Sequence, residues 1–198
     1  MSSGKQIIIL AGGNGAGKTS FYNSRLKHLH IPFVNADLIA RSLSDEISYE
    51  VSKRAQNFAQ ANIQEYFDQG ISFCFETVFS HESKIELIKE SRSKGYSVEL
   101  IYLHLESTDL NQARVYQRVL ESGHDVPSIK IKERVPRTLI NVIEAVKWVD
   151  GFTLLDNSSA ADPFQKIARV KNGKILFKSG SLPQWAVEIL KSFESSLT

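Results

Sequence analysis

The residues with the clearest chemical potential lie near the start of the chain, in Gly12-Gly-Asn-Gly-Ala-Gly-Lys-Thr19. This stretch fits the pattern G-x-x-x-x-G-K-[ST], in which glycines let the backbone wrap a phosphate chain with its N–H groups pointing inward. The lysine of such a loop reaches the β- and γ-phosphates, and the following hydroxyl holds Mg²⁺. We therefore predict an ATP- and Mg²⁺-binding loop in which Lys18 is also catalytic and Thr19 is the metal ligand. The predicted ATP-binding residues are Gly12, Gly13, Asn14, Gly15, Ala16, Gly17, Lys18, Thr19 and Ser20.

The sequence around this loop has the context that the motif requires. An apolar, β-branched run at 7–10 precedes it, and a helix-compatible segment at 19–29 follows it. A helix that starts at the loop adds a favourable field for an anion. The alternative, a glycine-rich turn that matches by coincidence, is disfavoured because motif and context agree.

Strand and helix patterns alternate along the rest of the chain, which predicts an α/β fold of three layers with a mostly parallel central sheet. We expect strands at 7–10, 31–34, 71–75, 96–105 and 152–155. We expect helices at 19–29, 37–43, 45–69, 81–94, 109–121, 129–149 and 183–195, the sixth interrupted near Pro136. Asn172-Gly173 between the runs 167–170 and 174–177 predicts a C-terminal β-hairpin. The 198 residues are expected to form a single domain.

Polar residues follow several of the predicted strands: Asn35-Ala-Asp37, Glu76-Thr77 and Asp156-Asn157. Ligands of such sheets bind outside the carboxyl ends of the strands, so these residues should converge on the phosphate loop. Asp37 has two open interpretations, a general base for an acceptor hydroxyl or the N-cap of the following helix. Arg41, one turn later, could pair with Asp37, contact a phosphate or be a solvated charge.

Glu76 is unusual because it follows a largely apolar strand. We favour its binding substrate hydroxyls or an outer-shell magnesium water over a buried pair with an arginine. Thr77 would be its hydroxyl partner on the substrate. Asn157 could contact the adenine edge of ATP or simply form a turn.

Four arginines, Arg114, Arg118, Arg134 and Arg137, flank a break at Gly123–Pro127. Helix, glycine turn and helix with several arginines is typical of a closing lid, here about 114–137, because phosphoryl transfer needs positive charge on the transferring oxygens. The alternative is a solvated basic helix face. We predict catalytic roles for Arg118 and Arg134, ATP binding for Arg137, and a surface position for Arg114. His124 within the break is expected to be structural.

Composition narrows the class of protein. The net charge of +2 does not indicate a nucleic-acid or membrane surface. A single cysteine, Cys74, cannot form an internal disulfide, and neither a signal-peptide pattern nor an apolar run of membrane-spanning length is present. A cytoplasmic protein without nucleic-acid or membrane partners is therefore expected.

The motifs together resemble one family. The phosphate loop, Asn35-Ala-Asp-Leu-Ile-Ala40, Phe75-Glu-Thr77, Gly123-His-Asp-Val-Pro127 with its nearby arginines, and Asp156-Asn-Ser158 occur in this order. This arrangement is similar to the zeta-toxin-like P-loop kinases, in particular the short stand-alone branch labelled predicted ABC-type ATPases, although no Leu-Ser-Gly-Gly stretch is present. The resemblance covers about residues 6–174.

The resemblance implies a P-loop kinase-like fold and transfer of the ATP γ-phosphate to a hydroxyl of a nucleotide-activated sugar, with UDP-N-acetylglucosamine as the best-known acceptor. It implies Asp37 as the base, Glu76 and Thr77 as acceptor-binding residues with Arg41 nearby, lid arginines on phosphate, and a possible antitoxin partner. The alternatives are a P-loop NTPase or regulatory nucleotide-binding module, and a kinase of another ribose or nucleoside hydroxyl.

Overall fold

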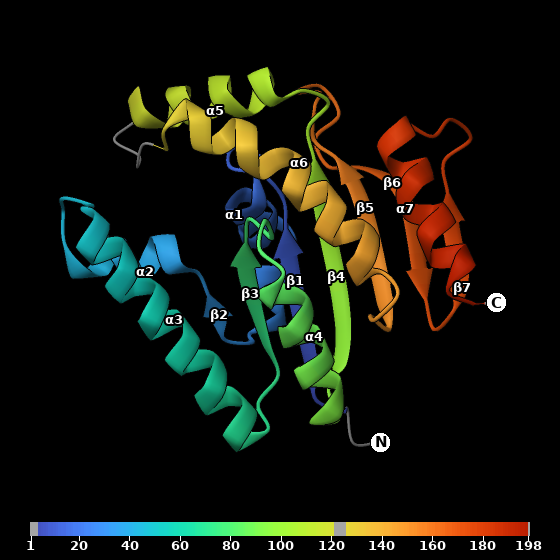
Figure 1. Ribbon diagram of the computed structural model, residues 1–198, viewed down its shortest axis with the longest axis horizontal. Helices are drawn as coiled ribbons and strands as arrows, with labels where there is room; N and C mark the ends of the chain where they lie inside the picture. Colours follow the sequence, from blue (N-terminus) through green and yellow to red (C-terminus); the bar gives the residue numbers. More distant parts are fainter. Residues whose placement is uncertain (1–3, 121–125, 198) are drawn as a thin grey trace.

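A computed structural model describes residues 4–120 and 126–197 of the chain. Its centre is a seven-stranded sheet with the order β2-β3-β1-β4-β5-β6-β7 (Figure 1). The first five strands in the chain run parallel, and the last two are antiparallel. The strands are β1 (Gln6–Ala11), β2 (Phe33–Val34), β3 (Phe73–Thr77), β4 (Ser97–His104), β5 (Gly151–Asp156), β6 (Gln165–Lys171) and β7 (Lys174–Lys178). The predicted α/β class with a mostly parallel sheet is confirmed.

Helices alternate with the parallel strands, as the sequence pattern predicts. They are α1 (Lys18–Phe21), α2 (Ala36–Leu43), α3 (Tyr49–Gln69), α4 (Ser83–Ser93), α5 (Thr108–Leu120), α6 (Ser128–Ala145) and α7 (Gln184–Ser195). None of the helices in the described ranges combines the length and apolar character needed to cross a membrane.

The central strands are buried on both faces, which is why β1 and β4 read as continuous apolar runs. Alternate side chains feed two cores. The larger core packs one face of the sheet against helices α3, α4, α6 and α7 (Figure 1). The smaller core packs the opposite face against Phe21 and, at its margin, Leu26 and Phe164. The phosphate loop begins at the end of β1. This strand is packed between the two cores, which hold the base of the loop in place.

Local turn signals are confirmed at three places. Gly70 and Gly95 adopt left-handed φ angles of 67° and 79° immediately after α3 and α4, where glycine has little steric cost. Asn172 and Gly173, with φ of 49° and 74°, connect β6 to β7 in a tight hairpin.

One expected helix feature is wrong, and a second expected helix is present but of mixed type. The helix α6 continues without interruption through Pro136, because this residue is exposed and the carbonyl one turn earlier can be solvated. The helix after the phosphate loop is α-helical only as far as Phe21, and then changes to a π-helix at Tyr22–Leu26 and a 3₁₀ turn at Lys27–Leu29.

The end of one strand, β3, differs from the expected one in a way that affects the site. We expected a strand at 71–75 followed by Glu76 and Thr77, but β3 ends at Thr77 and includes both residues. Leu10 of β1 pairs in register with Glu76, and Ala11 pairs with Thr77. Glu76 therefore lies directly beside the strand that leads into the phosphate loop.

Candidate active site

The phosphate loop between β1 and α1 is held in a conformation that needs glycine at several positions, of which Gly15 and Gly17 are the clearest. Gly15 and Gly17 have left-handed φ angles of 79° and 88°. A Cβ atom on Gly15 would lie 2.6 Å from the Asn111 carbonyl oxygen, and one on Gly17 would lie 2.5 Å from Asn157 Nδ2. Larger residues would be both strained and in collision, so the loop geometry depends on these glycines.

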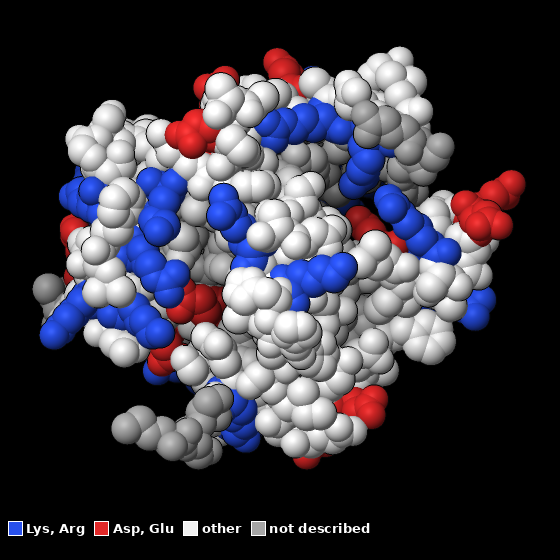
Figure 2. All heavy atoms as spheres, turned by 180° about the vertical axis from the view of Figure 1, so that it is seen from behind, with Lys and Arg blue, Asp and Glu red and all other residues white. Residues whose placement is uncertain are grey.

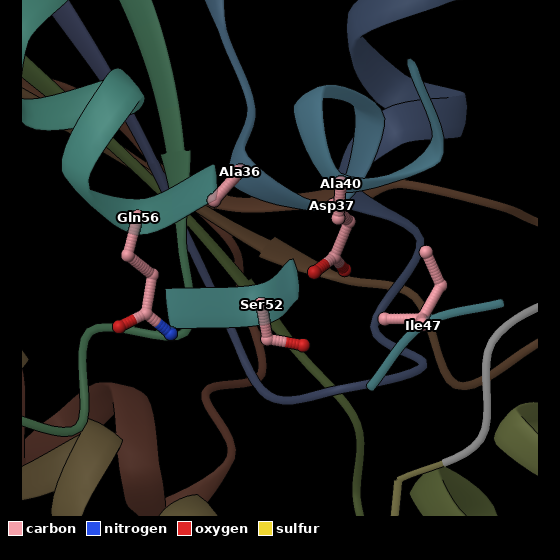
Figure 3. A pocket seen from close by; sticks show the side chains of 6 residues that line it. All are labelled: Ala36, Asp37, Ala40, Ile47, Ser52 and Gln56. Carbon is pink, nitrogen blue, oxygen red and sulfur yellow. The ribbon is translucent and has the colours of Figure 1, made fainter. Parts of the chain in front are cut away.

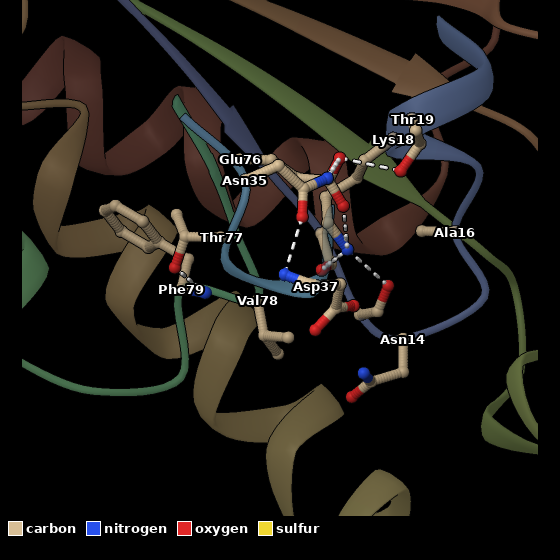
Figure 4. Close-up of polar contacts among 12 residues, drawn as sticks. Asn14, Ala16, Lys18, Thr19, Asn35, Asp37, Glu76, Thr77, Val78 and Phe79 are labelled. Carbon is tan, nitrogen blue, oxygen red and sulfur yellow. Dashed lines mark hydrogen bonds and ion pairs between the residues drawn. The ribbon is translucent and has the colours of Figure 1, made fainter. Parts of the chain in front are cut away.

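Lys18 is buried at the centre of the site (Figure 4). Its Nζ donates to the carbonyl oxygens of Gly12 and Gly13 at 2.8 and 3.1 Å, and it lies 3.8 Å from Glu76 Oε1. Burial lowers the pKa of Lys18 from its ordinary value; the charges of Glu76 and Asp37 oppose this shift. The two carboxylates therefore help to keep a positive charge where the phosphates of ATP would bind.

Glu76 accepts two further hydrogen bonds at its Oε2 atom, from Thr19 Oγ1 and from Asn35 Nδ2, both at 2.8 Å (Figure 4). The carboxylate thus adjoins Thr19, the predicted metal ligand. Oxygen ligands of this kind fit Mg²⁺, which is usually held by one or two protein oxygens together with phosphates and waters. Within residues 4–120 and 126–197, no group of three or more His, Cys, Asp or Glu side chains could hold a metal.

Asp37 lies in the first turn of α2, and its N-cap alternative is wrong. The cap is Asn35, whose Oδ1 accepts from the backbone N–H groups of Asp37 and Leu38 at 2.8 and 3.2 Å. The Asp37 side chain is exposed and lies near enough to Lys18 to raise its pKa. Asp37 is therefore a solvent-accessible carboxylate beside the phosphate site, free of a capping role.

The predicted lid residues fall into different environments. Arg118 on α5 is half-buried, and its charge contributes to lowering the pKa of Lys18. Arg134 on α6 is also half-buried. Arg137 is exposed and forms an ion pair with Glu133 at 3.8 Å on the same helix. The expected surface position of Arg114 is wrong: it is half-buried, and its Nη2 donates to the Ser158 carbonyl oxygen at 3.5 Å.

The remaining predicted site residues have fewer contacts with Lys18 and Glu76. Thr77 accepts a hydrogen bond from the Phe79 N–H at 3.0 Å, which shapes the loop after β3. Arg41 is exposed and forms no ion pair with Asp37, which leaves the guanidinium in solvent. Ser20 is exposed on α1. His124 and most of the Gly123–Pro127 break lie outside the described residues.

Two asparagines hold the phosphate loop from outside. Asn157 donates from Nδ2 to the Ala16 carbonyl at 2.9 Å and accepts from the Phe164 N–H at 3.2 Å. One N–H and one lone pair of its side-chain amide are thus bonded to backbone groups, and these bonds position the loop. Asn111 on α5 donates to the Asn14 carbonyl at 2.6 Å. Sequence reasoning missed Asn111 because a polar residue inside a helix carries no signal of its partner.

The surface over this region is hollowed. Viewed from behind, the molecule shows a hollow on the side of α5, with basic and acidic side chains at its rim (Figure 2). The site therefore combines the buried Lys18, the nearly buried Glu76, the exposed Asp37 and the half-buried Arg118, a set suited to binding polyphosphate and acting on a hydroxyl.

Comparison with known proteins assigns this arrangement to a family. The model of the zeta toxin family matches residues 25–150. The chain belongs to the zeta toxin family. A relative from Haemophilus influenzae, described as an uncharacterized protein, is 26% identical over 129 residues, which cover 65% of this chain and 91% of that protein.

Solved structures share the fold of this zeta toxin family member. The AvrRxo1-ORF1:AvrRxo1-ORF2 complex with ATP matches with a TM-score of 0.71 and 15% identity, covering 98% of this chain and 77% of that one. The PezAT toxin–antitoxin system of Streptococcus pneumoniae matches with a TM-score of 0.63 and 16% identity, covering 99% and 87%. The fold is thus that of P-loop kinases, and family and fold together support an ATP-dependent kinase.

Proposed function

We propose that this protein is a kinase that transfers the γ-phosphate of ATP to a hydroxyl of a nucleotide-activated sugar, UDP-N-acetylglucosamine or a related UDP-sugar. The observation that carries the proposal is the position of Asp37. An accessible carboxylate lies beside the buried Lys18 ammonium, where the phosphates of ATP would end. A hydrolytic NTPase has no need of a base for an acceptor hydroxyl, whereas a kinase does.

Each residue then has a chemical role. The loop backbone and Lys18 bind the phosphates, and Thr19 with Glu76 would hold Mg²⁺ directly or through water. The metal would neutralise charge that develops on the phosphate oxygens. Asp37 would orient the acceptor hydroxyl and take its proton, while Arg118 and Arg134 would stabilise the transferring group. Thr77 and Arg41 would contribute to binding of the acceptor, and Arg137 to binding of ATP.

The wider organisation is part of the same proposal. Residues 1–198 form one kinase domain in which 114–137 act as a lid over ATP. The PezAT neighbour is a toxin–antitoxin system, which supports an antitoxin as a possible protein partner. Since α5 is tied to the phosphate loop through Asn111, lid movement would be confined to the part of the helix pair beyond that contact.

The test is phosphate transfer from labelled ATP to a panel of UDP-sugars, using the wild type, Lys18→Ala and Lys27→Ala. We expect rapid transfer by the wild type and by Lys27→Ala, whose side chain is exposed and remote from the loop motif. Lys18→Ala should lose transfer while remaining folded, because the positive charge at the phosphate oxygens is gone. Equal transfer by folded Lys18→Ala would refute the loop assignment, and rapid ATP hydrolysis that no acceptor accelerates would favour an NTPase.

A further inference from the structure

A small pocket lies between α2 and α3, and Asp37 is part of its lining (Figure 3). Its lining comprises Ala36, Asp37 and Ala40 from α2, Ile47 from the connection, and Ser52 and Gln56 from α3. Its volume of about 30 Å³ exceeds the roughly 10–15 Å³ that a cavity needs on the same measure to hold one water molecule. The pocket therefore has room for one small polar substituent next to the proposed base.

The polar side chains of this pocket are unengaged. Among the described residues, no hydrogen bond or ion pair joins the side chains of Asp37, Ser52 or Gln56 to another group. Figure 3 shows the Asp37 carboxylate directed toward α3, and Ser52 and Gln56 projecting from the same face of that helix. One acidic acceptor and two groups that can both donate and accept thus border one space.

Several other serines and glutamines on the helices of this chain do have local partners. Ser42 and Ser91 return their hydroxyl groups to carbonyls of their own helices at 2.7 and 2.6 Å, as helical serines commonly do. Gln64 and Gln69 on α3 donate to carboxylates one turn away at 2.8 and 2.9 Å. Within the described part of the chain, Ser52, which is half-buried, and Gln56, which is exposed, have no such bonds, so their hydrogen-bonding groups are available to water or to a ligand.

The chemistry of the lining selects the kind of ligand. Asp37 is the only charged residue that lines the pocket, and it is anionic. A phosphate or carboxylate in this space would be repelled by Asp37 without a compensating cation. A neutral hydroxyl or amide would instead find donors and acceptors on α3 and apolar walls at Ala36, Ala40 and Ile47.

From this geometry we infer that Ser52 and Gln56 form a specificity subsite, which binds a neutral hydroxyl or amide substituent of the acceptor next to the hydroxyl that is phosphorylated. The inference rests on the proposed kinase function and adds to it the residues that choose the acceptor. The acceptor group at this position is therefore sugar-like and uncharged.

The test is calorimetric titration of the full chain, with Mg²⁺ and a non-hydrolysable ATP analogue, using UDP-N-acetylglucosamine, UDP-glucose and UDP-glucuronate. Gln56→Leu keeps volume and removes the amide, and Ser52→Ala removes only the hydroxyl. Gln60→Leu is the matched control, since Gln60 is exposed one turn further along α3 and does not line the pocket. Affinity for the ATP analogue is measured separately for each variant.

We expect a neutral UDP-sugar to bind, with affinity reduced about tenfold by Ser52→Ala and by Gln56→Leu, a typical loss for one hydrogen bond to a ligand. Gln60→Leu and all affinities for the ATP analogue should be unchanged. Equal binding by the pocket variants and the control overturns the inference, as does tighter binding of UDP-glucuronate or no binding of any neutral sugar. If sugar binding follows the expectation but no phosphate is transferred, the subsite stands and the kinase proposal fails.

Discussion

At the scale of single residues, the site is governed by how a few charges share a buried space. Lys18 is desolvated, and an isolated ammonium there would be costly. Two loop carbonyls and Glu76 compensate for the loss of water. Glu76 in turn is fixed by Thr19 and Asn35, so its second oxygen is held toward the lysine. Asp37, which has no such bonds, remains available for chemistry.

Among the described residues, the Glu76 carboxylate is hydrogen-bonded and the Asp37 carboxylate is not, and this difference leads to a prediction about Asp37. Asp37→Asn removes the base but leaves the Asn35 cap intact, so the stability of the fold and ATP affinity should change little. Acceptor phosphorylation should fall by roughly 10²- to 10⁴-fold, the usual range for loss of a general base. Steady-state transfer assays, with ATP affinity measured separately, provide the check. A variant that keeps the wild-type rate would remove Asp37 from the mechanism.

Glu76→Gln should act on a different step. Its carboxylate contacts Thr19 and faces Lys18, so loss of its charge should raise the Mg²⁺ concentration needed for half-maximal rate and lower kcat. The KM for the acceptor should be nearly unchanged. The measurement is a magnesium titration of the transfer rate at saturating ATP. A change confined to the acceptor KM would instead show that Glu76 binds the acceptor.

At the scale of elements, α5 and α6 bring arginines to the site while remaining tied to the rest of the fold. Asn111 connects α5 to the phosphate loop. Thr138 and Asn141 connect α6 to the loop after β3, through the carbonyl oxygens of Val78 and Phe79 at 2.8 and 3.0 Å. These contacts anchor the two helices that carry the half-buried Arg118 and Arg134, and the charge of Arg118 acts on Lys18.

This arrangement predicts unequal effects of arginine substitutions. Arg118→Ala and Arg134→Ala should each lower the transfer rate by about 10²-fold or more, as for other arginines that stabilise a transferring phosphate. Arg137→Ala should leave the rate at saturating ATP nearly unchanged, because this exposed side chain, paired with Glu133, would contribute only to binding. Single-turnover transfer rates at saturating ATP distinguish these outcomes. Similar, near wild-type rates for all three variants would mean that the helix pair is only a solvated basic surface.

At the scale of the whole molecule, α7 is joined to the sheet by a cluster of aromatic side chains. One member of this cluster, His104, has a strongly shifted pKa. His104 at the end of β4 stacks on Trp185 of α7, with ring centroids 4.4 Å apart. The Tyr102 hydroxyl is hydrogen-bonded to His104 Nδ1 at 2.9 Å. Burial lowers the pKa of His104 to about 4, against an opposing effect of Asp156. The folded protein therefore keeps this imidazole neutral under mildly acidic conditions.

The sign of the resulting pH dependence follows from proton linkage. Between the unfolded pKa near 6.5 and the folded pKa, the unfolded chain binds more protons, so the stability contribution present above pH 6.5 is lost as pH falls toward 4. Going from pH 7.5 to 5 should cost about 2 kcal/mol from this group. His104→Phe keeps a ring on Trp185 but cannot titrate, so its unfolding free energy should fall less over this range. Urea unfolding at both pH values tests this, and equal losses in both proteins would contradict it.

The sequence by itself determined the parts of this protein that depend on local patterns. The phosphate loop between a strand and a helix, the alternation that makes a parallel sheet, and the Asn172-Gly173 hairpin all follow from short-range rules of backbone conformation and periodicity. The motif order also indicated the zeta toxin family, which the family match confirms. The continuation of α6 through Pro136 did not follow, because the cost of a proline depends on whether the released carbonyl can be solvated.

Only the tertiary structure decided which polar groups meet. Glu76 and Thr19 are 57 residues apart in sequence, and their contact exists because β1 and β3 become neighbours in the sheet. Asn111, Ser52 and Gln56 lie on helices where a polar residue is compatible with either solvent or a site. Residue type and spacing define which bonds a side chain can make. The partner it finds depends on how distant elements pack, and that depends on long-range contacts that periodicity does not encode.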